Sequence, residues 1–117
     1  MIRKGKDHKR SQHENLRGGK GKLEMTHFFE EAESSGTGRI FARATIPPGS
    51  SIGEHPHNGE FEIYYLLKGV VQVTDNGKPG ILEAGDTMLC KNGDTHSIEN
   101  KSGQDAEILF LVLYDKR

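Results

Sequence analysis

Beyond Gly36 the chain divides into short segments of alternating polarity, each ended by residues that favour turns. In RIFARATI (39–46), apolar residues at every second position line one side, as in a half-buried strand. Pro47-Pro48 and Asn76-Gly77 mark turns, because proline cannot donate to a sheet ladder and Asn and Gly tolerate positive φ. No segment after Gly36 has convincing helical periodicity. The pattern predicts an all-β sandwich or barrel.

The same turn residues place the individual strands. The stretch 49–69 is typical of a strand, a loop and a strand, with glycine at each end. We expect strands at residues 23–29, 39–46, 62–67, 70–74, 80–82, 87–90, 95–99 and 107–114.

Length and charge indicate one domain with a basic arm. With 117 residues the chain supports one hydrophobic core, so we expect a single domain over 1–117. Residues 1–22 carry eight Lys/Arg against two acids, a net of +6, and the remainder carries eight against fifteen, −7. The basic segment has no aromatic residue to stack on bases. We interpret 1–22 as a solvated or partner-docked N-terminal arm without nucleic-acid binding, and 38–115 as the barrel core.

The sequence predicts a cytoplasmic protein that does not enter a membrane. No apolar run approaches the ~20 residues that span a bilayer. The basic start has no apolar stretch behind it, so it does not resemble a secretory signal. A single cysteine, Cys90, excludes an internal disulfide and fits a reducing compartment.

Two histidines one residue apart, His55 and His57, are the most specific chemical signal. In a strand, side chains at i and i+2 leave the same face about 6–7 Å apart, so both imidazoles can address one point. Glu62 begins the next strand and can return a carboxylate to that point, and His96 is the best candidate for a fourth ligand. Imidazole and carboxylate groups bind transition metals.

Each of these residues has a plainer interpretation when taken alone. A His-x-His pair on a surface strand is usually an exposed polar pair, and His96 can be a turn histidine. We interpret Glu60 as a solvated loop acid. The remaining histidines lie in the polar N-terminal third without matching partners, and we assign no site role to them: His8, His13 and His27.

Two stretches carry the spacings of a known family. The first has the order Gly49, His55, His57, Glu62, Gly69, and the second has the order Gly85, Gly93, His96, Asn100. They resemble the first and second cupin motifs, in the right order. The sequence is similar to small single-domain bacterial cupins that are described as oxalate-decarboxylase-like.

The resemblance implies a jelly-roll barrel, or double-stranded β-helix, of two antiparallel sheets. It also implies one divalent transition metal inside (manganese, iron, nickel, zinc or copper), held by the equivalents of His55, His57, Glu62 and His96. Three histidines and one carboxylate leave one or two positions open on an octahedral ion, as catalysis requires.

Because side chains alternate between the two faces of a strand, the ligand positions also indicate which neighbouring residues face the pocket. The residues expected on the same inner face as the ligands, and therefore near a substrate, are Tyr64, Met88, Cys90 and Ile98. A structural role is the alternative for both Cys90 and Tyr64. Arg39 and Arg43 are the candidates for an anion clamp, because Ile52 stands where oxalate decarboxylases have an arginine.

These features leave three functional hypotheses. The first is a metal-dependent enzyme, oxidative or decarboxylating, that acts on a small carboxylate- or enol-bearing metabolite. The second is a module that binds a small molecule or metal without chemistry, and the third is a metal-free structural barrel. Strands 61–67 and 107–114 are apolar on both faces, which predicts a homodimer that covers the outer face. The alternative is that the N-terminal third folds back over its own barrel.

Overall fold

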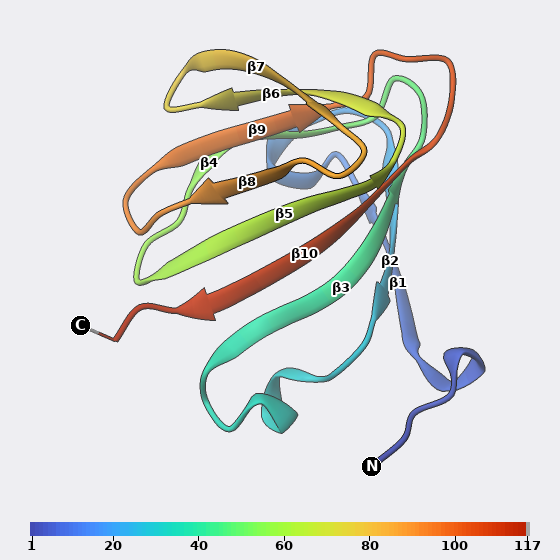
Figure 1. Ribbon diagram of the computed structural model, residues 1–117, viewed down its shortest axis with the longest axis vertical. Helices are drawn as coiled ribbons and strands as arrows, with labels where there is room; N and C mark the ends of the chain where they lie inside the picture. The colour runs from blue at the N-terminus through green and yellow to red at the C-terminus, as the bar shows by residue number, and fades with distance from the viewer. Residues whose placement is uncertain (117) are drawn as a thin grey trace.

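The computed structural model describes residues 1–116; Arg117, the last residue of the expected domain, lies outside the described residues. Two antiparallel sheets face each other (Figure 1). The larger has the strand order β1-β2-β3-β10-β5-β8 and the smaller β4-β9-β6-β7. The strands are β1 (Lys9–Glu14), β2 (Lys22–His27), β3 (Gly38–Ile46), β4 (Ser51–Pro56), β5 (Glu60–Lys68), β6 (Val70–Asp75), β7 (Lys78–Glu83), β8 (Thr87–Cys90), β9 (Thr95–Glu99) and β10 (Ala106–Tyr114), with 3₁₀ turns η1 (Gly5–Asp7), η2 (Leu16–Gly18) and η3 (Glu31–Ser34).

The expected alternation decides which side chains enter the space between the sheets. On β5, Glu62, Tyr64 and Leu66 are buried, whereas Tyr65 and Leu67 are exposed. β5 pairs with β10 on one side and with the edge strand β8 on the other, so both of its edges are held within the larger sheet. The all-β prediction is confirmed. None of the helices among residues 1–116 is long and apolar enough to cross a membrane.

The predicted tight turn at Asn76-Gly77 joins β6 to β7. Both residues have positive φ, 51° and 81°, as the commonest two-residue hairpin turn requires. Asp75 pairs with Lys78 directly across this turn. The turn therefore fixes the register of the outer hairpin of the smaller sheet.

The N-terminal segment differs from the expected solvated arm. Residues Lys9–Glu14 form β1, which pairs with β2 along its whole length, and β2 in turn pairs with β3 of the same chain. Leu23 and Met25 of β2 are buried in the core and anchor the hairpin. β1 itself has the sequence KRSQHE, which has no apolar alternation, so only its backbone partner identifies it as a strand.

Two irregularities break the alternation near the barrel mouth. Ile40 pairs with Val112 and Gly38 with Leu113, so one residue of β3, Arg39, is extra in the ladder. In β4 the register shifts in the same way between Ile52 and His55. Such bulges re-aim the side chains beside them.

Candidate metal centre

Four polar side chains converge between the sheets, as the sequence predicted. His55 lies on β4 and His57 follows its last residue, Glu62 lies on β5, and His96 on β9. All four are buried, and their potential ligand atoms lie within 4.8 Å of one another. The bulge in β4 decides which residue faces His96. Ile52 pairs with Ile98, and the extra residue in β4 then brings His55, and not Glu54, opposite His96.

The separations between these atoms match neighbouring ligands of a single ion. His57 Nε2 lies 3.0 Å from Glu62 Oε1 and 3.1 Å from His96 Nε2, and His96 Nε2 lies 3.1 Å from His55 Nε2. Two ligands bound ~2.1 Å from one ion at a right angle are about 3.0 Å apart. The donor set therefore fits a divalent transition metal.

The outer nitrogens of two histidines are held so that the inner nitrogens keep a lone pair. His55 Nδ1 lies 2.7 Å from the carbonyl oxygen of Gly53, and His57 Nδ1 lies 2.7 Å from Glu60 Oε1. Both partners are acceptors, so both Nδ1 atoms donate, and Nε2 is left free to bind a metal. His96 Nδ1 is buried without a hydrogen-bond partner among residues 1–116.

Glu60 is part of the site and not the solvated loop acid that the sequence suggested. Its exposed fraction is only 9%. Both carboxylate oxygens accept hydrogen bonds from Arg39, at 2.7 Å each, and one of them also accepts from His57. The Arg39 guanidinium, and after it the His57 hydrogen bond, lower the pKa of Glu60 to about 2. Arg39, Glu60 and His57 thus form a chain that orients the imidazole.

The surroundings shift the pKa values of His55 and His57 in opposite directions. Burial lowers the pKa of His55. Burial also opposes the charge on His57, but hydrogen bonds with Glu62 and Glu60 outweigh it and raise the pKa. Burial likewise opposes the charge on Glu62, yet hydrogen bonds with His57 and His96 keep its pKa below the usual value. The cluster therefore keeps its carboxylate ionised.

A cavity of about 180 Å³ opens onto three of these ligands, His55, His57 and Glu62. Of the two candidate clamps, Arg39 lines it because the β3 bulge turns its side chain, whereas Arg43 is exposed beside Arg10 and Thr26 on the outer surface. The cavity is lined by His13, Leu16, Arg17, Met25, Arg39, Ile40, Ile52, His55, His57, Glu62, Tyr64 and Phe110. Its rim includes residues from the N-terminal segment, to which the sequence assigned no site role.

The predicted substrate-contacting residues fall into two groups. Tyr64 lines the cavity, with its ring stacked on that of His96 at 4.8 Å between centroids. Met88, Cys90 and Ile98 are buried in the barrel, outside the set that lines the cavity, and their contact with a ligand stays a prediction. Burial raises the pKa of the Cys90 thiol to about 12, which favours a structural role for it.

Comparison with known proteins agrees with this geometry. A curated "Oxalate-binding protein" from Thermotoga maritima is 46% identical over 99 residues, which cover 85% of this chain and 82% of that protein. A crystal structure of a predicted oxalate decarboxylase from T. maritima superposes with a TM-score of 0.92 at 41% identity, covering 98% of this chain and 100% of the other. The cupin domain of Schizosaccharomyces pombe Cnp3 shares the fold, with a TM-score of 0.72 at 15% identity over 90% of this chain and 69% of that one.

The family assignment rests on the barrel itself. Residues 42–112 match the cupin domain family, a span that runs from β3 into β10 and includes all four converging side chains. This span is more than half of the chain, so the protein belongs to the cupin domain family.

Proposed function

We propose that this cupin holds one divalent transition metal (manganese, iron, nickel, zinc or copper) through His55, His57, Glu62 and His96, and uses it to bind a small carboxylate such as oxalate. The observation that carries the proposal is the convergence of four buried ligand atoms within 4.8 Å, three of them from residues that line a cavity. A bound ion would supply open coordination positions for carboxylate oxygens. The name of the T. maritima relative supports oxalate as the ligand to test first.

The chain's own residues prepare this site. The Gly53 carbonyl and Glu60 hold the Nδ1 protons of His55 and His57, so both rings present Nε2 to the cavity. Arg39 neutralises Glu60, which keeps this second carboxylate out of the ligand set. The cavity is small, about 180 Å³, and its apolar wall includes Ile52 and Phe110. These features favour a short ligand with a concentrated negative charge.

An enzymatic function is the second candidate. The open positions and the imidazole of His13, which lines the cavity outside the ligand set, favour an oxidative or decarboxylating reaction. Glu62 belongs to the ligand set and Glu60 pairs with Arg39, so neither carboxylate is free for proton transfer, which leaves that role to His13. We therefore rank binding above turnover. The cytoplasmic location remains part of the proposal, supported by the single buried thiol of Cys90.

The first prediction concerns the ligands and their support. Purified parent protein should contain one metal per chain, and His57→Ala should lose most of it while it stays folded. Glu60→Gln should weaken metal affinity by about 10- to 100-fold, because a neutral amide is a weaker acceptor for His57 and Arg39 than the carboxylate. Elemental analysis and competition with a chelator measure both effects. Glu54→Gln, which changes an exposed acid on β4, is the control. Equal metal in His57→Ala and the parent would show that the ligand assignment is wrong.

The second prediction concerns pH. Imidazoles must be neutral to bind a metal, and their ordinary pKa is ~6.5. In the metal-free protein the pKa of His57 is raised, so protons compete with the metal from above that value as pH falls. Metal occupancy against a fixed chelator should therefore drop steeply between about pH 7 and pH 5. Constant occupancy over that range would contradict a three-histidine site.

The third prediction is the binding of oxalate itself. Calorimetry with the manganese- or nickel-loaded protein should show one oxalate per chain, and removal of the metal should weaken affinity at least ~10-fold, or ~1.4 kcal/mol. The same samples, incubated with oxalate and dioxygen, test the alternative through release of carbon dioxide. Carbon dioxide release that depends on the metal would make the enzymatic function the better one. Oxalate affinity that is unchanged without metal would overturn the proposed function.

We further propose that the protein is a homodimer through the outer face of the larger sheet. Apolar side chains lie opposite one another across that face: Leu111 pairs with Ile63 and with Phe41, and Ile63 pairs with Leu89. Exposed fractions of 39% for Phe41 and 48% for Leu89 are high for side chains of this size. A contiguous apolar face of this kind usually marks an interface.

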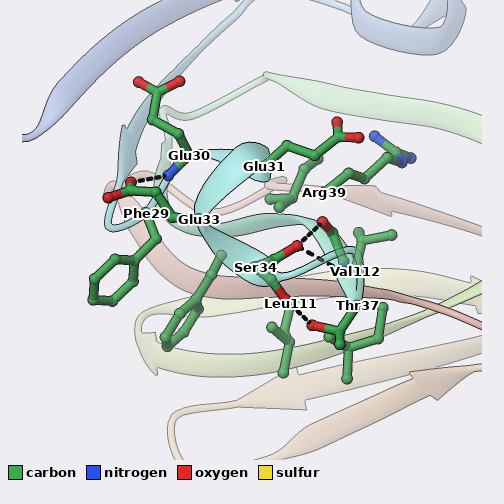
Figure 2. A pocket seen from close by; sticks show the side chains of 13 residues that line it. Phe29, Glu30, Glu31, Glu33, Ser34, Thr37, Arg39, Leu111 and Val112 are labelled. Carbon is green, nitrogen blue, oxygen red and sulfur yellow. Dashed lines mark hydrogen bonds between the residues drawn. The ribbon is translucent and has the colours of Figure 1, made fainter.

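A groove at one end of the same face supports this proposal. It measures about 300 Å³ and lies where η3 passes over β3 and β10, with Phe29 and Leu111 among its apolar walls. Figure 2 shows that the carboxylates of Glu30 and Glu31 point away from these apolar groups. The groove can accept an apolar side chain of a second copy, and a two-fold axis closes such a contact.

The fourth prediction is the mass in solution. Light scattering at micromolar concentration should give about twice the single-chain mass of 13.0 kDa. Leu111→Lys, at the middle of the apolar face, should shift the mass toward one chain because it buries an unpaired charge in the interface. Ile81→Lys on β7, where the side chain is 62% exposed, is the matched control and should leave the mass unchanged. A parent mass near 13 kDa would overturn the dimer.

A further inference from the structure

The connection between β1 and β2 lies directly on β4, beside the metal centre. Ser51 N donates to the Lys20 carbonyl, and Lys20 N donates to Ser51 Oγ, both at 2.9 Å. A Cβ at Gly53 would overlap the carbonyl oxygen of Arg17. The glycine in the β4 bulge therefore allows the η2 segment to approach the strand that carries His55.

Arg17 occupies this segment in an unusual conformation. Its backbone has φ 55° and ψ 33°, in the left-handed region that side-chain-bearing residues other than Asn and Asp rarely adopt. Asn15, two residues earlier, has the same conformation, which suits asparagine better than arginine. Strained residues that the surrounding structure holds in place cluster at functional sites, and Arg17 is such a residue beside the metal centre.

Arg17 is an exposed residue that adds a positive charge beside the cavity. Arg17 lines the cavity together with His55, His57 and Glu62. Among residues 1–116 its guanidinium makes no hydrogen bond or ion pair, whereas the guanidinium of Arg39 pairs with both carboxylate oxygens of Glu60.

We propose that Arg17 determines specificity for dicarboxylates, by pairing with the ligand carboxylate oxygens that are not bound to the metal. This inference rests on the proposed function and adds to it a recognition residue from the N-terminal segment. A guanidinium binds carboxylates through two parallel N–H donors, and such charge-assisted bonds are stronger and more directional than neutral ones. The η2 segment is then one wall of the binding site.

The fifth prediction tests this role with substitutions that suit the backbone. Arg17→Asn and Arg17→Gly tolerate positive φ, so both should fold with unchanged metal content and a melting temperature at or above the parent's. In the metal-loaded protein, oxalate affinity measured by calorimetry should fall about 10- to 100-fold. Acetate offers a single carboxylate to the metal, so its affinity should change less than about threefold. Arg17→Lys should recover part of the loss.

Arg43→Asn is the matched control, because Arg43 is an exposed arginine on the outer surface. It should leave oxalate affinity unchanged. Equal oxalate affinity in Arg17→Asn and in a parent that binds oxalate would overturn the role of Arg17 and leave the proposed function standing. A metal-loaded parent that binds neither oxalate nor acetate would overturn both. Equal losses of oxalate and acetate affinity would show that Arg17 supports the metal and not the second carboxylate.

Discussion

The burial of three imidazoles and one carboxylate at a single point is the constraint on which the rest of the structure depends. Polar groups taken out of water destabilise a fold unless each finds a partner. Here Glu62 contacts His57 and His96, while Glu60 and the Gly53 carbonyl hold the outer nitrogens. The Arg39–Glu60 pair extends this network to the barrel rim. Because Glu62 on β5 of the larger sheet contacts His96 on β9 of the smaller sheet, the network also links the two sheets.

Much of this arrangement follows from the sequence. Strand parity places Glu62 and Tyr64 on the inner face, and the i, i+2 spacing places His55 and His57 together. The strands with clear apolar alternation were predicted almost to their ends; β8 and β9 match residue for residue. Local patterning is sufficient where one face of a strand is buried, because a one-residue slip would turn the whole apolar set toward water.

The parts that sequence reasoning missed share a physical cause. The alternation of β3 predicts that the Arg39 side chain faces the outer surface. The extra residue in the ladder between β3 and β10 instead turns this side chain inward, where it contacts Glu60. The sequence predicts that Glu60 is a solvated loop acid, because its pairing with Arg39 is a tertiary contact. β1 is polar on both faces, so its membership of the sheet depends on β2, a partner that no local pattern reveals. Bulges and polar edge strands are tertiary features, and periodicity within one segment does not encode them.

The two faces of the larger sheet have different roles: the inner face supports the ligands and the core, and the outer face carries exposed apolar side chains. β5 and β10 present ligand-supporting and core residues inward, and apolar side chains outward, at alternate positions. A rigid ligand such as Glu62 needs a strand that does not move, and β5 is held by ladders with β10 and β8 on both edges. If a second copy packed on the outer face, these strands would be less free to move perpendicular to the sheet. The proposed dimer would therefore reduce the movement of Glu62, which lies on β5.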